Sequence, residues 1–123
     1  MPRKQTRGGR AIRWIEAYCL LPSGLDKGQH VRLTPVQRDI VRKTYDNPNG
    51  HHGAPPVTGT LAAYMALLHV CGPEALQKDF RPELSADIFT VWGAVGPDLR
   101  AVLKRDGGHV VCPELGTSYP VAA

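Results

Sequence analysis

The amino-acid sequence predicts a mainly α-helical protein, a small single-domain bundle of about four to five short helices with at most one minor two-stranded β element and a flexible basic N-terminal arm. The length of 123 residues is enough to enclose one modest core but not two. Apolar residues recur at three- and four-residue intervals in several separate segments, which is the period of a helix. The 13 glycines and 11 prolines separate these segments, so each element must be short.

The chain divides into an arm, a domain and a tail. Residues 1–9 combine basic side chains and glycines with almost nothing apolar, so they form the predicted arm. Residues 10–112 form the predicted helical domain, and residues 113–123 an irregular tail. A first helix is expected over residues 10–21, and Pro22 ends it. Its apolar residues fall on one face: Ala11, Trp14, Ile15, Tyr18 and Cys19.

The second helix has the clearest start signal in the chain. Thr34 can cap the helix, Pro35 fits its first turn because the missing N–H costs nothing there, and Gln37 can complete a capping box. The helix is expected to run to Tyr45, where a turn-forming segment follows. The residues expected to face inward are Val36, Ile40, Val41 and Tyr45.

A third helix is expected to begin near residues 58–60 and to end near residue 71. It is apolar on most sides, so it should be the central helix of the core. Gly72 suits a left-handed cap after its last turn. Two further short helices are expected over residues 85–92 and 97–105. Residues 109–112 are expected to form a short strand, which could pair with residues 30–33.

Positive charge is concentrated in the first half of the chain. The net charge is +4, yet residues 1–50 hold ten Lys or Arg against four acidic residues. Such an uneven distribution is typical of contact with nucleic acid, although a solvated basic surface that only aids solubility has the same composition. The residues expected to contact DNA are Arg3, Lys4, Arg7, Arg10 and Arg13, supported by Arg38, Arg42 and Lys43.

The third helix is not expected to read base sequence. Between Leu61 and Gly72 it carries no Arg, Lys, Asn or Gln, which are the side chains that contact base edges in the major groove. The loop before it is also far longer than the turn of a helix-turn-helix. Any DNA contact is therefore expected to involve phosphates and to lack strong sequence preference.

The loop before the third helix resembles a phosphate-binding loop but lacks its chemistry. Between Gly53 and Gly59 stand five residues instead of the usual four, and Thr60 occupies the position of the lysine. Pro55 and Pro56 have no N–H groups to direct at a phosphate. We therefore expect no nucleotide hydrolysis, no cofactor and no catalytic residue. The protein is expected not to be an enzyme, and an enzyme of an unrecognised kind is the remaining alternative.

The cysteines and histidines do not predict a metal site. Cys19, Cys71 and Cys112 form no CxxC pair, so they are expected to be reduced and partly buried. His109 and Cys112 are the one pair with ligand-like spacing, and a structural zinc site needs four ligands. Thiol catalysis by the same pair is a further alternative, which would need Cys112 to be activated by the histidine.

Residues 10–76 resemble the N-terminal segment of the large terminase subunit of tailed phages, the ATPase that drives DNA packaging. The matching motifs are Pro22-Ser23-Gly24, Gly28 to Leu33, Gln37, Tyr45-Asp46-Asn47-Pro48, Leu61-Ala62-Ala63, Ala66 to His69, and Gly72-Pro73-Glu74-Ala75. Gln37 resembles the family's adenine-side glutamine. The family's phosphate-loop lysine is missing, so the resemblance implies a terminase-like chain without a catalytic residue.

These observations favour a cytoplasmic, non-enzymatic prophage terminase-like accessory protein that contacts DNA through its basic arm. Neither a signal peptide nor a run of about 20 apolar residues, as a membrane span requires, is found in the sequence. Two alternatives stay open: a protein-interaction or oligomerisation module that docks on a packaging or host protein, and a decayed terminase remnant. The sequence does not predict the oligomeric state.

Overall fold

The structure, a computed structural model, describes residues 6–22, 24–25, 27–46, 57–72, 84–86, 88–106, 109–114 and 117–120. Its helices are α1 (Arg7–Tyr18), α2 (Pro35–Tyr45), α3 (Gly59–Cys71), α5 (Ile88–Gly93) and α6 (Pro97–Arg100). Its strands are β1 (Val57–Thr58), β2 (Leu84–Ser85), β3 (Lys104–Asp106), β4 (His109–Cys112) and β5 (Thr117–Pro120). The predicted mainly α-helical class is confirmed. None of the helices in these ranges is long and apolar enough to cross a membrane.

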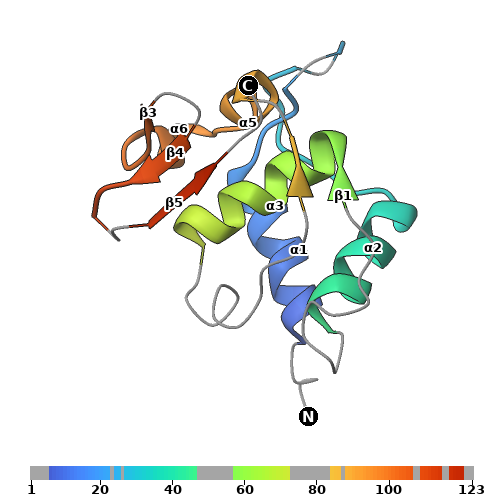
Figure 1. Cartoon of the computed structure of the whole chain (residues 1–123). Helices are drawn as coiled ribbons and strands as arrows, with labels where there is room; N and C mark the ends of the chain where they lie inside the picture. The colour runs from blue at the N-terminus through green and yellow to red at the C-terminus, as the bar shows by residue number, and fades with distance from the viewer. Residues whose placement is uncertain are drawn as a thin grey trace.

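Helix α3 lies at the centre of the molecule (Figure 1). It is enclosed by α1, α5 and all the strands except β3, and its residues from Leu61 to Leu68 are all buried. Exposure of apolar surface to water is unfavourable, so an apolar helix without a polar face is stable only when other elements cover it. The prediction of a central core helix is confirmed.

Helices α1 and α2 pack against each other beside α3 (Figure 1). They approach closely at Gly8, where an added Cβ would stand 2.9 Å from the Arg42 Cα atom. At this point the Gly8 N–H donates to Asp46 Oδ1 over 2.8 Å, and a carboxylate is favourable at a helix N-terminus. The Thr6 hydroxyl accepts from the Gly9 N–H in the same turn. These two acceptors satisfy amide groups that a helix leaves unpaired at its start.

These contacts place the start of α1 earlier than predicted. The helix was expected at residue 10 and begins at Arg7, so residues 7–9 of the predicted arm are helical. The signal that was missed is the Thr6 cap, together with a carboxylate supplied from 38 residues further along the chain. Arg3 and Lys4, in the rest of the arm, lie outside the described residues.

The capping box of α2 forms as predicted. The Thr34 hydroxyl accepts from the Gln37 N–H over 3.2 Å, and Gln37 Oε1 accepts from the Thr34 N–H over 2.9 Å. The inward position of Val36 is wrong, because this side chain is 70% exposed. The buried face of α2 consists of Val41, Thr44 and Tyr45, and Val36 lies away from it on the helix surface.

The structure contains more β structure than the sequence predicts. β1 and β2 form a parallel pair, and β3, β4 and β5 form a three-stranded antiparallel sheet. The predicted strand at residues 109–112 is confirmed, but it pairs with β3 and β5. Its expected pairing with residues 30–33 is wrong, because His30 makes only an isolated bridge to Leu20.

Three local predictions change for related reasons. The helix expected over residues 85–92 begins at Ile88, because Leu84 and Ser85 pair with β1. The helix expected over residues 97–105 ends at Arg100, because residues 104–106 form β3 and pair with β4. Residues 117–120 of the predicted irregular tail form β5. Gly72 has φ −78°, so it is not left-handed. A Cβ at this glycine would overlap the Leu68 carbonyl oxygen, so close approach is what requires a glycine there.

The three thiols are free, with Cys19 and Cys112 buried and Cys71 half-buried, as predicted. Burial raises the pKa of the Cys19 thiol well above its ordinary value, and the nearby Cys71 adds to the effect. Burial likewise raises the pKa of Cys71 to about 12, with a smaller contribution from Cys112. Residues distant in sequence thus share one apolar region, in which the neutral thiol is favoured.

Replacing Gly8 by alanine should destabilise the protein. The new Cβ would stand 2.6 Å from Asp46 Oδ2 and 2.9 Å from the Arg42 Cα atom, so the two helices must move apart. We expect a loss of about 1–3 kcal/mol in the free energy of unfolding, measured by urea denaturation. Gly9→Ala is the matched control, because its Cβ meets only the Thr6 hydroxyl, at 3.3 Å. Equal stability of the two variants would contradict the close packing of α1 on α2.

The raised thiol pKa values predict a loss of stability in alkali. Above the ordinary thiol pKa of 9.0, the unfolded chain releases protons that the folded chain still holds on Cys71, so stability falls as pH rises toward about 12. Denaturation at several pH values between about 8 and 11 should show this fall, and Cys71→Ala should make it shallower. Equal slopes in the variant and the parent would mean that the thiol does not titrate differently in the two states.

Candidate functional site

The basic residues predicted to contact DNA that the structure describes lie on α1 and α2 and differ in their exposure and ion pairs. Arg10 and Arg13 are exposed on α1, on the side opposite its buried residues Ala11, Ile12 and Ile15. Arg7 is exposed at the first position of the same helix. The structure therefore brings Arg10 and Arg13 to the exposed outer face of α1.

Glu16, the one acidic residue of α1, is turned toward α2 instead of outward. One of its oxygens, Oε2, accepts from the Leu33 N–H over 2.9 Å and from Arg38 over 3.2 Å. A carboxylate with several donors is held in one orientation. The carboxylate of Glu16 is thus engaged between α1 and α2, and part of the charge of Arg38 is neutralised.

The basic side chains of α2 differ from one another in their ion pairs and in their exposure. Lys43 pairs with Asp39 one turn earlier at 3.0 Å, with both side chains more than half exposed. An exposed pair of this kind contributes little, so Lys43 can leave it for another anion. Arg42 is exposed beside the Gly8 contact. α2 therefore adds Arg42 and Lys43 to the accessible positive charge, and Arg38 less so.

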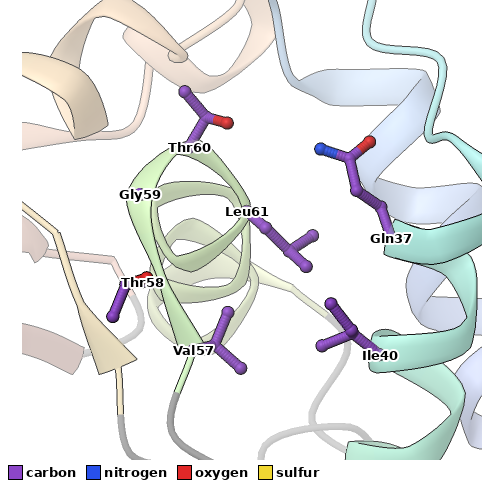
Figure 2. A pocket seen from close by; sticks show the side chains of 7 residues that line it. All are labelled: Gln37, Ile40, Val57, Thr58, Gly59, Thr60 and Leu61. Atoms are coloured by element: carbon purple, nitrogen blue, oxygen red, sulfur yellow. The ribbon is translucent and has the colours of Figure 1, made fainter.

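A cavity of about 440 Å³ lies between α2 and the start of α3. Figure 2 shows Gln37 and Ile40 projecting from α2 toward Val57 and Leu61, at the place where β1 leads into α3. The other lining residues are Thr58, Gly59 and Thr60. Among the described residues that line this cavity none is charged, and the Gln37 amide oxygen already caps α2. β1 leads directly into α3 at this place, and residues 47–56 of the glycine- and proline-rich loop lie outside the described residues.

The turn into α3 depends on a glycine. Gly59 has φ +71°, a conformation that other residues rarely adopt, and it forms the first position of the helix. Thr58 precedes it without a side-chain hydrogen bond to the first turn. A glycine at this position therefore allows the sharp turn from β1 into α3, and the described side chains that line the cavity provide hydroxyl, amide and apolar groups.

The cysteine and histidine alternatives find little support in the described part of the chain. His109 is exposed and Cys112 is buried on β4, so the pair does not form a ligand or catalytic set. Within the ranges that the structure describes, no group of three His, Cys, Asp or Glu side chains could hold a metal ion. His69 instead stacks on Tyr45, with 3.0 Å between its Nε2 and the tyrosine hydroxyl, and so links α2 to α3.

A second, polar cavity of about 260 Å³ was not predicted. It lies between α1, α2 and the segment before α2, and Glu16, His30, Val31, Arg32 and Arg38 line it. Sequence analysis overlooked Arg32, because its proximity to Arg38 depends on how residues 30–33 fold back along α1. The Val31 N–H donates to the Cys19 carbonyl over 3.1 Å and, together with the Leu33 contact to Glu16, fixes that path.

The sequence and the structure were compared with those of known proteins. No known protein-family model matches the chain. The large terminase subunit of Enterobacteria phage HK97 is 42% identical over 80 residues, which cover 59% of this chain and 16% of that protein. The crystal structure of the HK97 bacteriophage large terminase has the same fold over 97% of this chain and 28% of that one, with a TM-score of 0.66 and 24% identity.

The chain therefore spans only a small part of the length of the proteins it matches. Within that part, the motifs noted in the sequence and the arrangement of the elements agree with one another. In sequence and in fold, the chain is similar to the large terminase subunit of a tailed phage, which confirms the resemblance drawn from its motifs.

Proposed function

We propose that the chain is a non-enzymatic, terminase-like accessory protein that contacts DNA through phosphates. The observation that carries this proposal is the outer face of α1, which presents Arg10 and Arg13 while Glu16 is held inward by Leu33 and Arg38. Exposed arginines on a helix can reach successive phosphates, and such contacts position a protein on DNA without reading its sequence. The similarity to a large terminase subunit supports a place in DNA packaging.

The non-enzymatic part of the proposal is supported by the sequence of the loop before α3 and by the described lining of the cavity at the start of that helix. Phosphoryl transfer depends on cations that neutralise the developing charge on the phosphate oxygens. Thr60 stands at the position of the phosphate-loop lysine, and the described lining residues carry no charge: Gln37, Ile40, Val57, Thr58, Gly59, Thr60 and Leu61.

A second function, docking on another protein or on a second copy, is favoured by three exposed apolar side chains. Leu25 is 106% exposed, Phe89 72% and Val36 70%. Single exposed apolar residues are common on monomeric proteins, so a measurement of association must show whether these three contribute. Association in analytical ultracentrifugation that persists at high salt would favour this function, because apolar contacts are not screened.

The DNA contact predicts a specific change in salt dependence. Binding of a random duplex is measured by fluorescence anisotropy between about 50 and 200 mM salt, and each lost phosphate contact should flatten the log–log slope by about 0.9. The double variant Arg10→Ala/Arg13→Ala should therefore bind more weakly and with a flatter slope than the parent.

The matched control is Arg100→Ala/Lys104→Ala, which removes two exposed cations outside the basic half. An equal loss in both double variants would show that only net charge matters and would contradict the assignment to α1. The contribution of the arm is tested separately by deleting residues 2–5. A deletion that extended past Thr6 would also remove the cap of α1.

A further inference from the structure

The polar cavity between α1, α2 and residues 30–33 has more donors than acceptors. Its volume of about 260 Å³ is below the range of roughly 300–1,000 Å³ for drug-sized ligands, so it suits a small group. Two arginines, Arg32 and Arg38, and His30 line it together with one acidic residue, Glu16, which pairs with Arg38. The lining therefore carries a net positive charge.

The single carboxylate does not satisfy the two arginines. Glu16 Oε2 accepts from the Leu33 N–H. Arg38 Nη2 donates to the two carboxylate oxygens of Glu16, over 3.2 Å to Oε2 and 3.5 Å to Oε1. Arg38 Nε is buried and has no hydrogen-bond partner among the described residues. Arg32 is exposed and makes no ion pair within the same part of the chain. Two arginines with one carboxylate leave an excess of positive charge along the cavity, which favours an oxygen-rich anion there.

We propose that this cavity binds one phosphate group. Arginine forks match the oxygens of phosphate, and two forks with an imidazole donor can contact several oxygens of one tetrahedral group. The phosphate could belong to free inorganic phosphate or to a DNA backbone, which share this chemistry. The arginines of this site, Arg32 and Arg38, are not the arginines Arg10 and Arg13 that carry the proposed DNA contact, so different variants test the two proposals.

Isothermal titration calorimetry of the full chain with inorganic phosphate, against chloride at equal ionic strength, tests the site. The parent should bind one phosphate saturably, and Arg32→Ala should bind at least about tenfold more weakly, since a charge-assisted hydrogen bond is lost. Arg100→Ala is the control for charge and should leave the affinity unchanged. Absence of saturable binding to the parent, or an equal loss in both variants, would overturn the proposal.

A second variant tests the role of the carboxylate. Glu16→Gln keeps an oxygen that can accept from the Leu33 N–H and removes the one negative charge in the cavity. Phosphate should therefore bind several-fold more tightly to this variant. Weaker binding, with the fold intact by circular dichroism, would contradict the charge argument.

The source of the phosphate is determined by competition with thymidylyl-thymidine, a dinucleotide with one backbone phosphate. Displacement of inorganic phosphate by the dinucleotide would assign the cavity to the DNA backbone, and its failure to compete would assign the cavity to a free anion. The two proposals can fail separately: Arg10→Ala/Arg13→Ala should keep phosphate binding, and Arg32→Ala should keep its contact with duplex DNA through α1.

Discussion

The enclosure of α3 is the constraint on which the other elements depend. From Leu61 to Leu68 the helix is buried on every side, so it must be covered by helices and strands from both halves of the chain. Because α3 is covered, it cannot enter a DNA groove, and contacts with large partners fall to the elements around it. The way α1 and α2 pack then determines which of their charged side chains are exposed to water.

A few short contacts between α1 and α2 determine which charged side chains of these helices are exposed. Gly8 allows the two backbones to approach, and the Asp46 carboxylate accepts from the first turn of α1. At the other end, Glu16 is drawn toward Leu33 and Arg38. Two carboxylates are thus occupied between the helices, while Arg10 and Arg13 remain on the outside. The polar cavity lies beside the same contacts, with Glu16 and Arg38 in its lining.

The features that the sequence predicts well are those with local causes. The capping residues Thr34 and Gln37 fix the start of α2, and an all-apolar stretch identifies α3 as the core helix. The start of α1 was missed because its amides are satisfied partly by Asp46, which is distant in sequence. The strands β2 and β3 were taken for parts of helices, since two- and three-residue strands are defined by their partners more than by their own residues.

The candidate site shows the same division. The charge of the first half of the chain identified the basic residues, but helix geometry was needed to separate the outward Arg10 from the paired Arg38. The missing lysine in the loop before α3 was visible in the sequence, whereas the uncharged cavity facing Gln37 was not. Arg32 could not be identified because its neighbours come from α1 and α2, and no local motif marks it.

The proposed function requires that DNA contacts the outer face of α1 and does not contact the start of α3. Its most direct test is a two-dimensional ¹⁵N nuclear magnetic resonance titration with a short duplex at low salt, following the backbone amides and the arginine side-chain Nε–H signals. The account predicts shifts for Arg10 and Arg13 and for the exposed amides around them, with Gly59, Thr60 and Leu61 unmoved. Shifts centred on Gly59 to Leu61, or no shifts on α1, would contradict it.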